Sequence, residues 1–245
     1  MNWLHHHLPE VESTNDYAMA WIRQHGLTSP MLVTADHQTH GRGQRDKVWR
    51  SQSGEDLCMS LALPVMPHWD PAELNKKVAL VTRDVVMRQA PDGIDEDDVL
   101  IKWPNDLLIM HRGRPHKVCG MLLENTWRGN QWTHVIIGIG INVLSKNVGT
   151  MSMALSLKEA WNVEIVPQEL AKDLTSNLID SLQASASLEG YDDHLFGLNE
   201  SREFLVRGEL KRGMLLSINP LGQGEFLWGE TRERLSSSEV EWLWD

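Results

Sequence analysis

A lysine, an asparagine and an aspartate lie close together around a proline in the segment 102–106, which reads KWPND. Proline has no N–H to continue a strand ladder, and asparagine and aspartate favour turns, so the segment predicts a bend. Apolar residues at 99–101 and 107–109 predict a strand on each side. A cation and a carboxylate on such a bend suit an anionic substrate beside a group that accepts a proton or binds a metal. A β-bulge with a surface ion pair is the alternative.

A basic, glycine-containing segment at 36–49 follows a predicted strand at 31–35. Gly41 and Gly43 flank Arg42, and glycine permits positive φ angles and close approach of a ligand to the backbone. Successive N–H groups in such a loop can bind an anion. The segment and its border add four cations in an acidic protein: Arg42, Arg45, Lys47 and Arg50. The pattern predicts a phosphate-binding loop, with a flexible solvated loop as the alternative.

A second lysine stands beyond a predicted hairpin turn at 111–114. The returning strand is expected at 117–124, with Lys117 at its start and Gly120 further along, where another backbone or a ligand can come close. Lys102 and Lys117 are therefore expected on neighbouring strands beside one pocket. The alternative is that one of them is a surface lysine.

A β-branched, glycine-containing run at 132–143 predicts a buried strand. Gly138 and Gly140 leave space above the sheet for a flat ring, and the amide of Asn142 offers both a donor and an acceptor. No third glycine opens a helix after this strand, which excludes a dinucleotide-binding fingerprint.

The remaining elements must hold these groups in place. Ser13 or Thr14 is expected to cap a helix that ends at Gly26, and free N–H groups at that helix start can also hold a polar ligand. A strand at 57–63 is expected to precede three helices. The first begins at Pro71, the second is expected around 151–161 and the third at 167–183.

From residue 202 the pattern changes to short strands with glycine-rich turns, at 204–209, 214–219, 224–228 and near 240–244. They predict a small β-barrel of about 45 residues, which is too small to be very stable alone and is expected to dock on the larger domain.

The composition is that of an ordinary globular protein, with 41% hydrophobic and 23% charged residues among 245. A net charge of −11 argues against general nucleic-acid binding. No apolar run approaches the ~20 residues of a membrane span, and the N-terminus lacks signal-peptide features, so a cytoplasmic protein is expected. Cys58 and Cys119 are expected as buried free thiols, with a disulfide as the alternative. The histidines at 5–7 are expected in a strand, and the acidic segment 92–98 in a solvated turn.

Five of these segments together resemble the biotin–protein ligases (biotin–[acetyl-CoA-carboxylase] ligases) in order and spacing, and KWPND is the most specific of them. The segments are 13–15, 38–45, 102–106, 117–120 and 138–142. The resemblance implies an α+β fold with a mixed β-sheet and helices packed mainly on one face, as in class II aminoacyl-tRNA synthetases. A C-terminal SH3-like β-barrel follows. The catalytic domain is expected at 1–199 and the barrel at 200–245.

The resemblance also implies a reaction in two steps. The carboxylate of biotin attacks the α-phosphate of ATP, which enters with Mg²⁺, and gives biotinyl-5′-AMP and pyrophosphate. A lysine of a biotin carboxyl carrier protein domain then attacks the mixed anhydride and releases AMP. The enzyme must therefore bring two anions together and shield a hydrolysable intermediate.

Roles carried over by motif fall into three groups. The ring of biotin is expected to contact Ser13, Thr14, Asn15 and Gln38, and its carboxylate Gly41, Arg42, Gly43, Gln44, Lys117 and Gly120. ATP and its phosphates are expected to contact Arg42, Arg45, Trp49, Lys102, Asn105 and Asn142. The expected catalytic residues are Lys117, Arg42 and Asp106. Asp106 either orients or deprotonates the acceptor lysine or binds Mg²⁺; the metal ligands are not assigned.

The loop departs from the family pattern GRGRRGR at three positions, because Gln44, Asp46 and Lys47 replace arginine, glycine and arginine. A carboxylate beside a phosphate loop weakens anion binding, and loss of glycine restricts the loop. The departures bear on loop closure, on retention of the intermediate and on affinity.

Two other function classes fit part of the pattern: a lipoate or octanoate ligase of related architecture, and a module that binds biotin without catalysis. The chain starts almost at the catalytic fold, so no DNA-binding domain and no repressor role are expected. A free edge strand could pair with the carrier domain or with a second copy in a homodimer.

Overall fold

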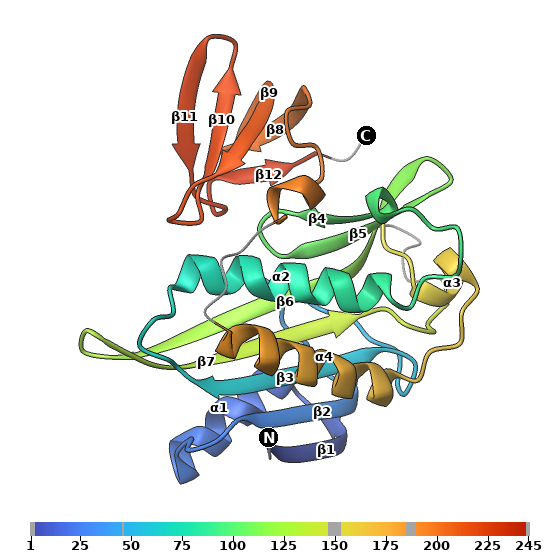
Figure 1. Ribbon diagram of the computed structural model, residues 1–245, viewed down its shortest axis with the longest axis vertical. Helices are drawn as coiled ribbons and strands as arrows, with labels where there is room; N and C mark the ends of the chain where they lie inside the picture. The colour runs from blue at the N-terminus through green and yellow to red at the C-terminus, as the bar shows by residue number, and fades with distance from the viewer. Residues whose placement is uncertain (1–2, 46, 147–152, 185–189, 244–245) are drawn as a thin grey trace.

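The computed structural model describes residues 3–45, 47–146, 153–184 and 190–243. A seven-stranded mixed sheet forms its larger part, in the order β1-β2-β3-β7-β6-β5-β4 (Figure 1). The first two strands are parallel, and the other neighbours are antiparallel. The strands are β1 Leu4–Val11, β2 Met31–Gln38, β3 Leu57–Pro64, β4 Val99–Lys102, β5 Asp106–His111, β6 Arg114–Arg128 and β7 Gln131–Ile141.

Helices α2 (Pro71–Met87) and α4 (Pro167–Gln183) cover one face of this sheet, as Figure 1 shows. Apolar side chains of the strands pack against them, among them Leu57, Met59 and Leu61 of β3. Helix α1 (Thr14–His25) packs on the opposite face, against Met31, Val33, Ala62 and Ile136. The expectation of a mixed sheet with helices mainly on one face is confirmed.

The predicted ends of α1 are confirmed. The side chain of Ser13 accepts a hydrogen bond from the N–H of Asp16, and Gly26 ends the helix with a φ of 77°. Glycine adopts this left-handed φ without steric cost. The cap places Thr14 and Asn15 in the first turn, where both are buried.

The helix predicted around 151–161 is wrong in extent. Helix α3 covers only Leu157–Trp161, and Ser156 caps it with Glu159 in a reciprocal capping box. Residues 151–152 lie outside the described part of the chain. The residues just before the cap pair with β6 instead, because the N–H of Lys117 donates to the carbonyl of Met153 and the N–H of Leu155 donates back to Lys117.

The C-terminal strands form a second sheet of five, in the order β11-β10-β9-β8-β12. Its centre contains Phe204 and Phe226, both fully buried, with their rings edge to face. Strand β11 was not predicted, because its sequence TRERL has three charged residues in a row and one apolar residue. The strands are β8 Arg202–Val206, β9 Glu209–Ile218, β10 Gly224–Trp228, β11 Thr231–Leu235 and β12 Val240–Trp242. This sheet is consistent with the SH3-like domain, and the predicted boundary at 199/200 falls just before β8.

Two short 3₁₀ helices complete the structure, η1 at Glu96–Asp98 and η2 at Asp192–His194. The first lies within the acidic segment, has no buried residue and fits the expected solvated turn. Across the described ranges, none of the helices has both the length and the apolar character needed to cross a lipid bilayer.

Candidate active site

Pairing across the sheet brings the predicted site residues onto one face. Partners in neighbouring antiparallel strands project to the same side of a sheet. The register therefore makes a continuous row on the face that carries α1, running through Ser60, Gly138, Gly140, Gly120, Asp106 and Lys102. Three glycines at the middle of this row leave the sheet open there.

A β-bulge turns Lys117 toward this row. Leu107 pairs with Cys119, whereas Leu108 pairs with Lys117, so Val118 is an extra residue on β6. Lys117 lies three residues before Gly120, so strict alternation would place it on the opposite face; the extra residue restores the same face. Its Nζ lies 2.6 Å from Oδ1 of Asp106. The strand begins at Arg114, earlier than predicted, so Lys117 lies within β6 and not at its start.

Lys102 and Lys117 were predicted on neighbouring strands, and this is wrong, because β5 lies between β4 and β6. Asp106 of β5 joins them: its Oδ2 lies 3.4 Å from Nζ of Lys102 and its Oδ1 contacts Lys117. Burial lowers the pKa of Lys102 and the Lys117 ammonium lowers it further, while the Asp106 carboxylate raises it. One carboxylate thus holds two ammonium groups at the bend.

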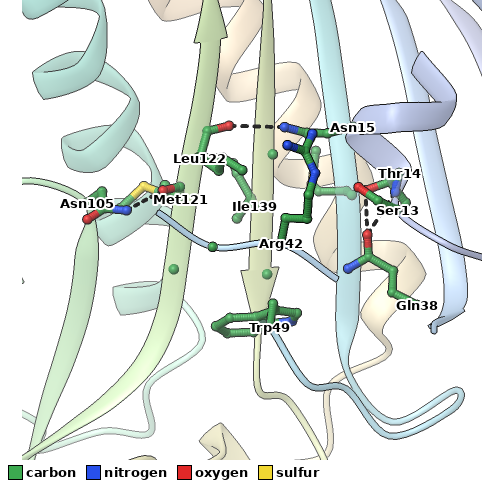
Figure 2. Close-up of a pocket in the computed structure, with 15 residues that line it drawn as sticks. Ser13, Thr14, Asn15, Gln38, Arg42, Trp49, Asn105, Met121, Leu122 and Ile139 are labelled. Carbon is green, nitrogen blue, oxygen red and sulfur yellow. Dashed lines mark hydrogen bonds between the residues drawn. The ribbon is translucent and has the colours of Figure 1, made fainter. Parts of the chain in front are cut away.

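A first cavity of about 440 Å³, its open mouth included, lies between α1, β3, β7, β6 and the glycine-containing loop (Figure 2). A neutral hydrogen-bonded network forms one wall. Oε1 of Gln38 accepts from the N–H and hydroxyl of Thr14, at 2.8 and 3.1 Å. The hydroxyl of Ser60 lies 2.7 Å from Oγ1 of Thr14 and 2.5 Å from Oδ1 of Asn15. Such a wall suits a ligand that is polar and uncharged.

The glycines of β7 make room for the protein's own side chains. A Cβ on Gly138 would overlap the amide of Asn15, and a Cβ on Gly140 would overlap the indole of Trp49. The flat ring expected above the sheet is therefore, at Gly140, that of Trp49. This indole also lies close to Gly120, and Nζ of Lys117 lies 5.8 Å from its ring centre. Its Nε1 is buried and has no hydrogen-bond partner among the described residues.

The loop crosses the mouth of the cavity, and Arg42 extends from it toward Asn15 (Figure 2). Its guanidinium donates to Asp16 at 2.6 Å and to both oxygens of Glu124 at 3.0 and 2.9 Å. Gly41 allows the tight path of this loop, since a Cβ there would lie 2.5 Å from the carbonyl oxygen of Trp49. Arg42 is thus paired with two carboxylates in the structure.

A second cavity of about 540 Å³, its open mouth included, adjoins the first and is lined by three cations, Arg45, Lys47 and Lys102, and by two carboxylates, Asp106 and Glu241. Asn105 lines both cavities, and its Nδ2 donates to the carbonyl of Met121 at 2.5 Å. Arg45 donates to the carbonyl of Val240 in the C-terminal domain at 3.4 Å, and Lys47 lies 3.6 Å from Glu241. The other lining residues include Gln44, Pro104 and Trp242. This cavity suits a polyanion.

Of the predicted residues, Gly41, Lys117 and Asn142 line neither cavity. Asn142 is buried, and its Nδ2 donates to the carbonyl of Leu155 at 3.4 Å. Its own N–H donates to Val118, so it supports the backbone at the bulge. Its predicted contact with a nucleotide stays a prediction.

Ser60 and Glu124 were not predicted as site residues from the sequence. Alternation in 57–63 places Ser60 on the face opposite Leu61. A small polar residue in an otherwise apolar strand was the one feature that could have indicated a site on that face. Glu124 ended a predicted strand, and nothing local distinguished it from a solvated glutamate.

No group of three or more histidine, cysteine or acidic side chains that could hold a metal ion is present within the ranges that the structure describes. Cys58 and Cys119 are free and buried, as predicted. Burial raises the pKa of the Cys58 thiol to about 11 and raises that of Cys119 as well. Neither thiol is therefore a nucleophile at neutral pH.

A pocket with neutral polar walls thus adjoins a cavity lined by charged side chains, and Lys117 lies beside residues of both. The model of the biotin/lipoate A/B protein ligase family matches residues 8–142. The chain belongs to this family.

Relatives and solved structures agree with this assignment. The chain is 42% identical over 196 residues to the bifunctional ligase/repressor BirA of Bacillus spizizenii. The aligned region covers 79% of this chain and 52% of that protein. It is 30% identical over 136 residues to the biotin–[acetyl-CoA-carboxylase] ligase of Paracoccus denitrificans, covering 56% and 53%. The chain thus spans about half the length of these relatives. The biotin protein ligase of Aquifex aeolicus, solved with biotin and ATP, shares the fold, with a TM-score of 0.75, 21% identity and 99% of each chain covered.

Proposed function

We propose that this chain is a biotin–protein ligase, which activates biotin with ATP to biotinyl-5′-AMP and transfers biotin to a lysine of a biotin carboxyl carrier protein domain. The observation that carries the proposal is the position of Lys117. The bulge turns its ammonium toward Asp106, which lines the second cavity, and beside Gly120 and Trp49, which line the first. The names of the relatives support biotin as the acid.

The ring of biotin binds in the first cavity, among Ser13, Thr14, Asn15 and Gln38. Its carboxylate then lies toward Trp49 and Lys117, where the glycines leave the sheet open. The unpartnered Nε1 of Trp49 is a donor for a carboxylate or phosphate oxygen. Gly120 and Gly140 let this indole lie against the sheet, because a Cβ at either position would contact it.

The phosphates of ATP bind in the second cavity, near Arg45, Lys102 and Asn105. Mg²⁺ enters with ATP as part of the substrate, since the phosphates themselves supply oxygen ligands. A carboxylate oxygen of biotin forms a bond to the α-phosphorus while the bond to the bridging oxygen breaks, and pyrophosphate leaves. Lys117 stabilises the charge on the α-phosphate oxygens in that transition state.

In the second step the acceptor amine attacks the acyl carbon, AMP leaves with the electron pair, and the amine loses a proton. Asp106 is the carboxylate nearest to Lys117, and it accepts or orients that proton. Asp106 holds the two ammonium groups Lys102 and Lys117 before reaction, so a third amine can take the same kind of contact. The buried free thiols fit a reducing cytoplasm, which we propose as the compartment.

The test is transfer to protein. The chain is incubated with biotin, MgATP and a carrier domain, and the carrier is analysed by mass spectrometry. We expect a biotin adduct on one lysine of the carrier, and no adduct when that lysine is replaced or when ATP is omitted. Biotin binding without adduct and without biotinyl-5′-AMP would support a non-catalytic biotin-binding module and would overturn the proposal.

A further inference from the structure

Glu124 of β6 joins two parts of the site that come from distant segments of the chain. Its Oε2 accepts a hydrogen bond from Nδ2 of Asn15 at 2.7 Å. Both of its oxygens also accept from Arg42, at 3.0 and 2.9 Å. The side chain of Glu124 is 27% exposed, so it is more shielded from water than its partner Arg42, which is 42% exposed.

The contact with Asn15 fixes which way the amide points. A carboxylate accepts hydrogen bonds and cannot donate them, so the NH₂ of Asn15 must face Glu124. The carbonyl oxygen of the same amide then faces the hydroxyl of Ser60, 2.5 Å away. A flipped amide would set an oxygen against the carboxylate of Glu124. The carbonyl of Leu122 accepts from the same Nδ2 at the longer distance of 3.4 Å and favours the same orientation. The first cavity, called the ring pocket below, therefore has one arrangement of donors and acceptors, and Glu124 makes the shorter of the two contacts that select it.

The contact with Arg42 fixes the loop. Arg42 belongs to the glycine-containing loop, whereas its partners Asp16 and Glu124 lie on α1 and β6. The guanidinium thus spans the mouth of the first cavity between two rigid elements, beside Asn15 (Figure 2). Two carboxylates balance its charge, so an anionic ligand would have to compete with both for this arginine. Lys117, with one carboxylate partner that it shares with Lys102, is the better placed cation for the anion.

We propose that Glu124 is a positioning residue of the ring pocket, and that Glu124 and Asp16 together form a latch that holds the loop over that pocket through Arg42. Only the identity of the ring depends on the proposed function. The latch can be tested without biotin.

Three variants separate the two roles. Glu124→Gln keeps the size of the side chain but removes its charge and one of its two acceptor oxygens. Asp16→Asn weakens the latch and leaves the contact with Asn15 in place. Glu164→Gln is the matched control, since Glu164 is exposed, pairs with Lys158 and lies away from both cavities.

The first readout is hydrogen exchange of the amides at 39–45 in the unliganded protein. We expect exchange to be about threefold to tenfold faster in Glu124→Gln and about twofold to threefold faster in Asp16→Asn, because half-exposed ion pairs have modest strength. Glu164→Gln should exchange like the unmutated chain. Unchanged hydrogen exchange in both Glu124→Gln and Asp16→Asn would overturn the latch.

The second readout is equilibrium binding of biotin, together with KM and kcat for ATP–pyrophosphate exchange. Glu124→Gln should raise the Kd for biotin about tenfold, since a charge-assisted contact and the orientation of Asn15 are lost, while kcat at saturating biotin changes little. Asp16→Asn should raise the Kd by no more than about threefold. A fall in kcat with unchanged Kd in Glu124→Gln would overturn the positioning role. Failure of the unmutated chain to bind biotin would instead contradict the proposed function, and the hydrogen-exchange result would still decide the latch.

Discussion

The two cavities of this site are built from opposite materials. In the first, Thr14, Asn15 and Ser60 are at most 4% exposed, uncharged and bonded to one another. In the second, charged side chains meet from the loop, the bend and the C-terminal domain, and Lys47 and Glu241 are 70% and 51% exposed. A buried neutral network is held at fixed geometry, whereas exposed ion pairs exchange partners at little cost.

This difference indicates how the work is divided. The rigid cavity selects the acid by the positions of its donors and acceptors, because an analogue that leaves buried groups unpaired is rejected. The charged cavity receives phosphates, releases pyrophosphate and admits a protein lysine, and each of these events needs contacts that form and break.

Replacing Lys117 should abolish activation of the acid. We expect Lys117→Met to lower biotin-dependent ATP–pyrophosphate exchange by about 10²- to 10³-fold, because the transition state loses a preorganised positive charge. The methionine fills the space of the lysine stem, so the melting temperature should stay close to that of the unmutated chain. Lys211→Met, in the C-terminal sheet, is the matched control and should exchange normally. Near-normal exchange in Lys117→Met would refute the role of Lys117.

Adding a methyl group to either glycine of β7 should distinguish the end of the first cavity beside Asn15 from the end beside Trp49 and Lys117. Gly138→Ala would push against the amide of Asn15, and Gly140→Ala against the indole of Trp49. We expect Gly138→Ala to raise the Kd for biotin in the absence of ATP by about tenfold or more, with a loss of about 1–3 kcal/mol in stability from overpacking. Gly140→Ala should reduce exchange more than it reduces biotin binding. Equal effects of both changes on binding and exchange would contradict the division of roles.

Removing the hydroxyl of Ser60 should weaken the pocket from behind. Ser60→Ala leaves Oδ1 of Asn15 without its buried donor, which costs about 1–3 kcal/mol of unfolding free energy. Urea unfolding measures that loss, and calorimetry should show weaker biotin binding. Thr175→Val, in the interior of α4, is the control: it removes a buried hydroxyl that donates to Ala171 at 2.7 Å. It should cost stability and leave biotin binding unchanged.

The smallest effect concerns the C-terminal sheet. Hydrogen bonds from the N–H of Ser236 and from Arg207 lower the pKa of Glu239 from 4.5 to about 2. A carboxylate with a depressed folded-state pKa stabilises the fold above its unfolded value and loses that contribution as the pH falls toward the folded value. The urea concentration at the unfolding midpoint should therefore decrease as the pH is lowered from 4.5 to about 2. In Glu239→Gln this decrease should be less steep. Glu230→Gln, an exposed change in the same domain, should keep the steep fall.

The charged cavity could be predicted from the sequence better than the neutral one. Arg45, Lys102 and Asp106 stand out because charges near glycines and a proline mark a bend and a loop, and these are local signals. Ser60 and Glu124 became site residues only through the register of β3, β7 and β6, which pairs residues far apart in the chain.

Lys117 shows a second limit. Alternation along β6 would have placed it on the opposite face from Gly120, and only the extra residue Val118 brings it round. Strand β11 was not predicted either. It lies at the edge of its sheet, and its sequence TRERL has charged residues at its centre and one apolar residue, so it lacks the alternation of a half-buried strand. Helix ends, by contrast, were local: Ser13, Gly26 and Pro71 gave boundaries that the structure confirms.

The most direct test of the central claim is acid-dependent ATP–pyrophosphate exchange with Mg²⁺, in which biotin, lipoate and octanoate are compared on the same preparation. We predict exchange with biotin alone, because the donors and acceptors of the first cavity suit a polar ring, whereas octanoate has an apolar chain. Exchange with lipoate or octanoate in place of biotin would contradict the account and would assign the chain to the lipoate branch of its family.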